Sequence, residues 1–389
     1  MKRILWLASW YPTRLDPLTG DFIERHAQAA SQLDDVWVFH VVKDNSGHQK
    51  TNCFVETKTY HAHCRASICY YRTGNSPFSF WEKLRSNWLY LRHYRRMIRS
   101  YIREQGKPDL IHVHIALKAG IPALLAKWFY GIPYVVSEQW TGLCPEAKPN
   151  LDQQPFLFRQ AWKWVMRGAS GWTAVSDYLG RAIQGRFALS PCRVIPNVVD
   201  TRLFYPGPAA PGPFRFIHIS LLNYQKNPEL LLEATAKLRE ISRMPFRLVV
   251  VGHWPPQLKQ LAEKLALLPI LDLIEPCPQL QLADQMRQCH TLILCSRFET
   301  FGCVIIEANA CGLPVIVSDI PVLRENTQPG VTGVLVPPGR ANALAEAMRG
   351  IMEDDNAFDS PGIVRLTGDK YSYPPVAASF HEFYETISR

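Results

Sequence analysis

The sequence predicts an α/β protein of two domains, each built around a parallel sheet. Three observations lead to this prediction: a length of 389 residues, short β-branched runs that alternate with segments of helical periodicity, and one proline-rich break. Such alternation is typical of parallel sheets with helical crossovers, and the length suits two hydrophobic cores. The expected strands cover residues 4–8, 36–42, 110–114, 134–136, 172–175, 216–220, 247–252, 291–295 and 314–318.

The break lies at residues 205–213, where four prolines and two glycines exclude a regular helix or strand. We therefore expect a first domain over residues 1–204, a linker over 205–213 and a second domain over 214–370. Residues 374–387 carry an apolar stripe at helical spacing, so the end of the chain, 371–389, should form a helix that packs on another element. Parallel sheets bind ligands beyond the carboxyl ends of their strands, so two such domains facing one another would enclose a cleft.

The composition indicates a globular chain with an anionic partner. The formal net charge of +9 favours a nucleoside diphosphate, an acidic lipid surface or nucleic acid, without choosing among them. No apolar run approaches the roughly 18 residues that span a bilayer. The first ten residues resemble a secretory signal, but Arg14 and Asp16 follow without a small-residue cleavage site, which favours a buried strand. Ten scattered cysteines fit reduced thiols, so we expect a cytoplasmic protein.

One group of potential metal ligands occurs in the first domain. His61, His63, Cys64 and Cys69 are close together in the sequence, yet they lack the paired spacing of a structural zinc site. A polar loop is the alternative interpretation. We expect no metal site in this protein.

The segment after the strand at 291–295 carries the chemistry. Gly302 ends a short loop, and residues 303–311 read as a helix closed by Gly312 and Pro314. This places a helix N-terminus, with its free N–H groups and positive dipole end, at the carboxyl edge of the sheet. Such an N-terminus suits a diphosphate, and Gly302 would let the charge approach the backbone closely.

Two glutamates flank this helix N-terminus. Glu299 lies in the loop, and Glu307 lies about two turns further along the chain. A carboxylate accepts hydrogen bonds from vicinal hydroxyls, so both residues are candidates for reading a ribose or a hexose. Spacing alone also permits two solvated glutamates.

The surrounding pattern resembles the retaining glycosyltransferases of the family-4 type, also called glycosyl transferases group 1. The strongest part is Glu299 and Glu307 followed by Ala-Asn-Ala-Cys-Gly-Leu-Pro-Val-Ile-Val-Ser-Asp at 308–319. The resemblance covers nearly the whole chain and is stronger from residue 173 onward. Further landmarks stand in the family's order at residues 20–22, 112–114, 173–176, 194–200, 226–228, 249–252, 333–339 and 371–373.

The resemblance implies the GT-B architecture, in which two Rossmann-like domains face each other across a cleft and the C-terminal helix crosses back to the first domain. The first domain would bind the acceptor and the second the nucleotide-sugar donor. Retention through front-face attack needs no protein nucleophile, and the absence of an Asp-x-Asp triplet agrees with metal independence. The donor would be a UDP-, GDP- or ADP-sugar, with no separate cofactor.

The resemblance also implies roles for individual residues. Glu307 would bind the nucleotide ribose, Glu299 the transferred sugar and Lys226 the diphosphate. His114, at the end of a buried strand, is expected to point toward the cleft as a catalytic contact, with a packed structural histidine as the alternative. The remaining donor-binding candidates are Gly20, Gly252, Gly302 and the amides of Cys303 and Val304.

The chain departs from the family pattern at two positions. Leu221 stands where an arginine commonly precedes the diphosphate lysine, and Asn223, Gln225 or Arg324 are candidate substitutes. Gln139 replaces a frequent histidine, which keeps hydrogen bonding but loses protonation. These changes indicate an altered donor preference or reduced activity.

Residues 81–103 read as one long amphipathic helix. A cationic stripe lies beside an apolar stripe that includes Leu84, Trp88 and Ile98, and Trp81, Tyr90, Tyr94 and Tyr101 are expected as interfacial aromatics. Such a helix suits an anionic membrane surface near a lipid-linked acceptor, and an ordinary solvated surface helix is equally compatible. No nucleic-acid-binding motif is present, so nucleic acid is not expected as a partner. The cationic stripe consists of Arg92, Arg95, Arg96, Arg99 and Arg103.

Together these features favour a hexosyltransferase of polysaccharide biosynthesis that uses a nucleotide sugar and a saccharide or lipid-linked saccharide acceptor. We expect it in the cytoplasm, peripherally bound to the inner face of the plasma membrane. Two alternatives stay open. One is a nucleotide-sugar 2-epimerase-like enzyme of the same shape, and the other is a non-catalytic sugar- or membrane-binding partner of a polysaccharide assembly complex.

Overall fold

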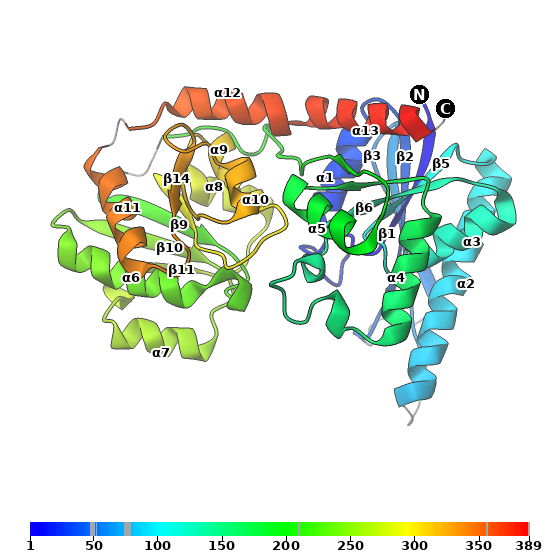
Figure 1. Cartoon of the computed structure of the whole chain (residues 1–389), viewed down its shortest axis with the longest axis horizontal. Coiled ribbons are helices and arrows are strands. Elements are labelled where there is room, and N and C mark those ends of the chain that lie inside the picture. Colours follow the sequence, from blue (N-terminus) through cyan, green and yellow to red (C-terminus); the bar gives the residue numbers. More distant parts are fainter. Residues whose placement is uncertain (47–50, 52, 74–78, 209–210, 355–356, 388–389) are drawn as a thin grey trace.

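The computed structural model describes residues 1–46, 51, 53–73, 79–208, 211–354 and 357–387. Residues 209–210 of the expected linker therefore lie outside the described residues. The described chain contains two sheets, one on each side of this linker in the sequence. They occupy separate halves of the molecule (Figure 1). The α/β fold class with two parallel sheets is thus confirmed.

The first sheet has eight strands in the order β3-β4-β2-β1-β5-β6-β7-β8. All neighbours pair in parallel except β3 and β4, which form an antiparallel pair at one edge. Buried β-branched and aromatic side chains fill its central strands, as expected for a sheet covered on both faces. The strands are β1 (Arg3–Ala8), β2 (Asp35–Lys43), β3 (Cys53–His61), β4 (Cys64–Tyr71), β5 (Leu110–His114), β6 (Tyr134–Glu138), β7 (Gly171–Ala174) and β8 (Arg193–Val194).

The hairpin of β3 and β4 corrects the sequence interpretation of this region as a polar loop. His61 ends β3 and Cys64 begins β4, so the group of potential ligands straddles the turn. Cys64 and Cys69 are five residues apart on one strand, and side chains an odd number apart point to opposite faces. These two thiols therefore cannot share one metal ion.

The second sheet has six parallel strands in the order β11-β10-β9-β12-β13-β14. The outer strands β11 and β14 were not predicted, because they are short and only partly buried. The order reverses between β9 and β12, which is the point where ligands bind in open parallel sheets. The strands are β9 (Phe214–Ile219), β10 (Phe246–Val251), β11 (Leu271–Ile274), β12 (Thr291–Leu294), β13 (Val315–Ser318) and β14 (Gly333–Val336).

Helices cover the faces of both sheets. In the first half they are α1 (Asp21–Ala30), α2 (Ser79–Gln105), α3 (Gly120–Tyr130), α4 (Phe156–Gly168) and α5 (Asp177–Phe187). In the second half they are α6 (Pro228–Ile241), α7 (Pro256–Lys264), α8 (Gln279–Arg287), α9 (Cys303–Ala310), α10 (Pro321–Asn326) and α11 (Ala341–Glu353). Among the described residues, no helix is both long and apolar enough to cross a membrane.

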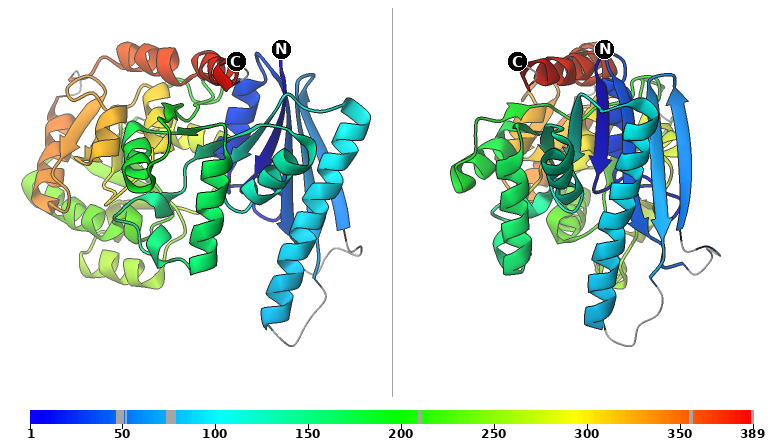
Figure 2. Two further views of the ribbon diagram at one scale, coloured as in Figure 1. Left: turned by 45° about the vertical axis from the view of Figure 1, so that its right-hand side comes forward. Right: turned by 90° about the vertical axis from the view of Figure 1, so that its right-hand side faces the viewer.

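The last two helices run along one side of both halves (Figure 1, Figure 2). Helix α12 (Ser360–Tyr371) packs on α9, and α13 (Tyr373–Ile387) packs on α1. Phe380 and Tyr384 of α13 are fully buried beside β1 and β5. The end of the chain therefore joins the core of the first domain.

A buried polar chain fixes α13 to the first sheet. His112 shares hydrogen bonds of 2.7 Å with the hydroxyls of Tyr384 and Ser137, and Ser137 contacts the Thr173 hydroxyl at 2.6 Å. Buried polar groups are costly unless paired, so these contacts compensate the burial of His112.

Buried neutral histidines predict a stability that depends on pH. Burial lowers the pKa of His26, His40 and His218 to about 4, whereas an unfolded histidine titrates near about 6.5. The unfolded chain then takes up protons that the folded chain refuses, so stability is full above pH 6.5, falls between about 6.5 and 4, and levels off below. The loss is on the order of 3 kcal/mol per histidine.

Urea denaturation at pH 7.5 and pH 5 measures the part of this loss that falls above pH 5. The exposed His253 provides a control, because His253→Gln should leave the difference between the two free energies of unfolding unchanged. Equal free energies of unfolding at both pH values would contradict the burial of neutral imidazoles.

Candidate active site

The expected helix N-terminus is present at the carboxyl end of β12. Gly302 precedes α9 with φ of 88°, in the left-handed region that favours glycine. A Cβ there would also meet side chains of Ile305 and Leu323 at 3.2 Å. Cys303 and Val304 form the first turn of α9, where helical amides have no acceptor within the helix. The chain thus directs these N–H groups beyond the sheet edge, as the sequence predicts.

Glu299 and Lys226 meet in the loops before α9 and α6. The Lys226 ammonium forms an ion pair with the Glu299 carboxylate, and both side chains are largely buried. The Ser296 hydroxyl donates to the same carboxylate at 2.7 Å, and the Gln225 amide donates at 3.1 Å. Three donors therefore hold Glu299 in one orientation, and its charge is compensated by Lys226.

Glu307 is paired with a residue of the first domain that the sequence interpretation missed. Nη1 of Arg25, on α1, lies 2.6 Å from Oε1 of Glu307, and both side chains are about 95% buried. Arg25 also contacts Asp21 at 3.2 Å, and the Gln279 amide donates to Asp21 at 2.6 Å. One ion pair, Arg25–Glu307, and one hydrogen bond, from Gln279 to Asp21, thus connect α1 to the second domain.

Burial dominates the electrostatics of this ion pair. It raises the pKa of Glu307, and the Arg25 guanidinium opposes that shift. Burial alone would lower the pKa of Arg25, but Asp21 and Glu307 raise it above its ordinary value. Glu307 therefore depends on a cationic or hydrogen-bonding partner to remain ionised in this environment.

Further contacts between the two domains lie around α9, the loop before it and α10. The Asn197 amide donates to Sγ of Cys303 at 3.2 Å, and the Cys144 thiol lies 3.6 Å from the Glu299 carbonyl oxygen. The amides of Asp177 and Tyr178, which begin α5, donate to the Glu325 carboxylate at 2.8 and 2.7 Å. The predicted segment therefore lies at the junction of the two domains.

Two family profiles together match residues 35–361 of the chain. Residues 35–203 match Glycosyltransferase Family 4, and residues 203–361 match Glycosyl transferases group 1. The chain belongs to the group 1 glycosyltransferases. This confirms the family that the motif order indicated.

Individual proteins support the same assignment. A D-inositol 3-phosphate glycosyltransferase of Catenulispora acidiphila is 29% identical over 276 residues, which cover 65% of this chain and 66% of that protein, just under two thirds. Sucrose-phosphate synthase of Thermosynechococcus elongatus is similar in structure, with a TM-score of 0.77, 21% identity and 99% of both chains covered. HepE of Anabaena, solved with UDP and glucose, is also similar in structure, with a TM-score of 0.73 and 19% identity. The superposition covers 99% of this chain and 100% of HepE. The GT-B fold is thereby established.

Gly20 and Gly252 are the other two glycines that were expected to bind the donor in this group 1 glycosyltransferase. Both permit close backbone packing. Gly20 begins the turn into α1 with φ of 81°, and a Cβ there would lie 2.6 Å from the Tyr11 nitrogen. Gly252 follows β10, and a Cβ there would lie 2.4 Å from the Ser220 carbonyl oxygen. Gly20 thus positions α1 and Arg25, whereas Gly252 holds two strand ends together. Donor contacts at both glycines stay predictions.

His114 lies in the core of the first domain. It is fully buried, stacks on Trp6 with ring centroids 3.9 Å apart and has no described hydrogen-bond partner. Burial lowers its pKa well below the usual range, with His112 and His26 adding to the shift. The packed alternative that the sequence left open describes this arrangement, and a catalytic role for His114 stays a prediction.

The structure also shows where the two residues that depart from the family pattern, Gln139 and Leu221, are located. Gln139 is buried and donates to Nδ1 of His26 at 3.3 Å, while Nε2 of His26 donates to the Pro196 carbonyl at 2.9 Å. Leu221 is 76% exposed. Gln225, one of the candidate substitutes for the missing arginine, contacts Glu299, as described above. The other two are engaged elsewhere: Asn223 accepts a hydrogen bond from the Lys226 amide, and Arg324 pairs with Asp319.

A pocket of about 580 Å³ opens on the first domain beyond the ends of β1, β2 and β5. Its aromatic lining includes Trp10, Trp140 and Phe158, and its polar lining includes Lys118 and Glu138. The Glu138 carboxylate accepts from the Trp162 indole at 2.9 Å and from the Ala116 amide at 3.1 Å. Trp140 is half-buried and lines this pocket.

Proposed function

We propose that this protein transfers a hexosyl unit from a nucleoside-diphosphate sugar to a saccharide or lipid-linked saccharide acceptor, with retention and without a metal ion. The observation that carries the proposal is the meeting of Glu299, Lys226, Glu307 and the start of α9 beyond the carboxyl end of β12. These groups can bind a sugar, a diphosphate and a ribose along one line.

The proposed reaction breaks the bond between the anomeric carbon and the distal phosphate oxygen. An acceptor hydroxyl forms the new glycosidic bond on the same face, and its proton passes to the departing phosphate. Lys226 and the amides of Cys303 and Val304 stabilise the charge that grows on that phosphate, because fixed donors cost little reorganisation. Glu299 holds the sugar, and Glu307 holds the ribose.

Donor binding then requires the charged groups to change partners. Lys226 is paired with Glu299, and Glu307 is paired with Arg25, so the protein already compensates each buried carboxylate. An incoming diphosphate attracts Lys226, and ribose hydroxyls compete for Glu307. Arg25 is then available to the phosphates from the opposite domain.

The pocket on the first domain is the proposed acceptor site. Trp10 and Trp140 offer apolar ring surfaces to the C–H faces of sugars, and Lys118, Asp16 and Glu138 offer polar contacts. A volume of about 580 Å³ is in the range of pockets that bind small molecules.

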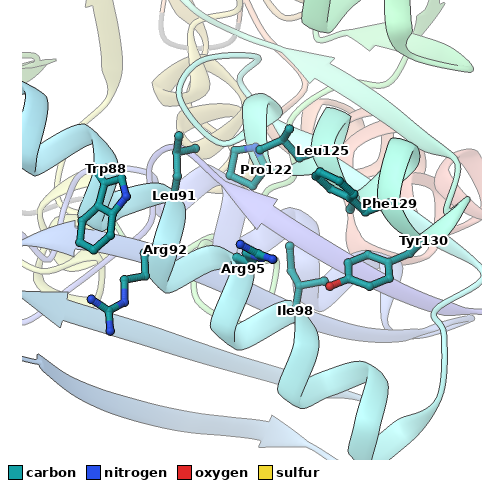
Figure 3. Close-up of a pocket in the computed structure, with 10 residues that line it drawn as sticks. Trp88, Leu91, Arg92, Arg95, Ile98, Pro122, Leu125, Phe129 and Tyr130 are labelled. Carbon is teal, nitrogen blue, oxygen red and sulfur yellow. The ribbon is translucent and has the colours of Figure 1, made fainter.

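The surface of helices α2, α3 and α4 supports the proposal that the acceptor is presented at a membrane. They pack consecutively against one another, and Trp88, Trp128 and Trp164 are each more than 55% exposed on them. A pocket of about 350 Å³ lies between α2 and α3, with the apolar side chains of Leu91 and Phe129 beside cationic groups (Figure 3). We therefore include peripheral binding to an anionic membrane, from the cytoplasmic side, in the proposal.

One part of the expected amphipathic pattern is wrong. Three tyrosines lie on the buried face of α2 and pack on the first sheet, so they cannot act as interfacial aromatics: Tyr90, Tyr94 and Tyr101. The exposed side of α2 instead carries Trp81, Trp88 and the predicted arginines. Arg92 also lies over the Trp88 ring at 5.1 Å.

Membrane binding is expected to depend on these arginines. The double variant Arg92→Gln/Arg95→Gln should bind anionic vesicles roughly 25-fold more weakly, because each cation near the surface contributes about 1 kcal/mol. Sedimentation with vesicles containing phosphatidylglycerol measures the affinity. The matched control Arg243→Gln/Arg340→Gln removes two exposed cations of the second domain and should bind as the wild type does. Equal binding by both double variants would exclude this surface.

Acceptor-dependent release of nucleoside diphosphate tests the proposed transfer. Thermal shift with a panel of nucleoside diphosphates and their sugars, UDP-glucose included, first selects the donor. Release that requires an acceptor, with a product of the donor's anomeric configuration by NMR, supports the proposal. Epimerisation of the donor without acceptor supports the 2-epimerase-like alternative instead. Donor binding without turnover for any acceptor supports the non-catalytic alternative.

A further inference from the structure

Two cysteines and a histidine from distant parts of the sequence meet on the outer edge of the first sheet. Sγ of Cys53 on β3 lies 3.4 Å from Sγ of Cys69 on β4 and 3.6 Å from Nδ1 of His93 on α2. All three ligand atoms lie within 4.8 Å of one another. None of these three residues lines the proposed acceptor pocket, although Tyr71, which His93 contacts, does.

The hairpin explains why the two thiols point to the same side. Val55 is paired directly with Cys69, and Cys53 is two residues before Val55. Side chains two apart on a strand share a face, so Cys53 and Cys69 are diagonal neighbours across the pair. Helix α2 packs over this face of the hairpin and brings His93 to the thiols, with its ring against Tyr71 at 5.5 Å.

The spacing of the three atoms suits a tetrahedral soft-metal site. Zinc bonds of about 2.3 Å to sulfur and about 2.0 Å to nitrogen give tetrahedral edges of about 3.8 Å between sulfurs and about 3.5 Å between sulfur and nitrogen. The separations of 3.4 and 3.6 Å lie close to these edges. Thiolate and imidazole ligands select zinc and similar soft ions over calcium or magnesium.

A pocket leaves one side of the cluster accessible. It has a volume of about 360 Å³ and is lined by all three residues together with Ser67, Arg96 and Glu104. Three protein ligands with an open fourth position are typical of zinc sites that bind water or an external ligand. Two thiolates also neutralise the charge of a divalent ion.

We propose that Cys53, Cys69 and His93 bind one Zn²⁺ ion, whose fourth ligand comes from the adjoining pocket. Bound zinc connects the β3–β4 hairpin to helix α2. Because α2 carries the exposed tryptophans and arginines, the ion would hold this surface against the sheet. The sequence interpretation missed the site, since Cys53 and His93 are 40 residues apart and share no motif.

Titration with Co²⁺, a spectroscopic probe for zinc, tests the proposal. The full-length protein is prepared without a histidine tag, reduced and freed of metal by a chelator. We expect one Co²⁺ per chain, a sulfur-to-cobalt charge-transfer absorption, displacement by one equivalent of Zn²⁺ and a raised Tm with Zn²⁺. Cys69→Ser and His93→Gln should each weaken binding at least about tenfold.

A control and a second ligand variant keep the test decisive. Cys192→Ser removes a half-buried thiol elsewhere in the first domain and should leave the affinity unchanged. Cys53→Ser, at a half-buried position, serves if the buried Cys69→Ser variant does not fold. The absence of charge-transfer absorption, or wild-type affinity in the folded ligand variants, would overturn the proposal. So would the loss of two titratable thiols on mild oxidation without metal uptake, which would indicate a disulfide instead.

Discussion

Lys226→Ala is expected to lower the rate of sugar transfer about 100- to 1,000-fold, because a fixed donor to the departing phosphate stabilises the transition state by this amount in other enzymes. The variant also leaves the buried Glu299 carboxylate without its cationic partner, although Ser296 and Gln225 still donate to it. Initial rates of nucleoside diphosphate release at saturating donor measure the effect.

The exposed Lys264 of the same domain supplies the matched control. Lys264→Ala changes the net charge equally and should keep the wild-type rate. A Lys226→Ala protein that folds normally and retains more than about a tenth of the wild-type rate would show that Lys226 does not stabilise the negative charge on the departing phosphate.

Glu307→Gln is expected to weaken nucleoside diphosphate binding about 10- to 100-fold. Hydrogen bonds to a charged group contribute about 1.5–3 kcal/mol, and the amide offers the ribose hydroxyls a weaker acceptor. The substitution also removes one of the two carboxylates that compensate Arg25, while Asp21 remains, so the free energy of unfolding should fall by at most about 3–5 kcal/mol. Isothermal titration gives the affinity, and urea denaturation gives the stability.

Glu353 at the end of α11 is exposed, so Glu353→Gln controls for the loss of one carboxylate. It should change neither affinity nor stability. If folded Glu307→Gln bound the nucleotide as tightly as the wild type, the Arg25 pair would be structural and the ribose would be read elsewhere.

Much of the fold was predictable because the central strands are continuous apolar runs. The strand expected at residues 110–114 matches β5, and the helix expected from residue 303 begins at Cys303. The edge strand β3 was missed because it is only partly buried and mixes polar and apolar residues. The misassigned Tyr94 has a related cause: periodicity defines the faces of a helix but not which face meets the sheet.

The part of the candidate site that lies on one segment was predictable from the sequence, but its contacts with the other domain were not. Glu299, Gly302 and Glu307 belong to one segment, so their spacing was readable from the sequence. Arg25 pairs with Glu307 from 282 residues away, and only the packing of the two domains brings them together. The predicted Gly20 was a partial signal, because it begins the helix that carries Arg25.

A structure of the protein with its selected nucleoside diphosphate tests the central claim most directly. We predict the distal phosphate at the amides of Cys303 and Val304 and near Lys226, with the ribose hydroxyls on the Glu307 carboxylate. A nucleotide bound elsewhere, such as in the pocket beside Glu233 and Pro338 or in the pocket of the first domain, would contradict the account.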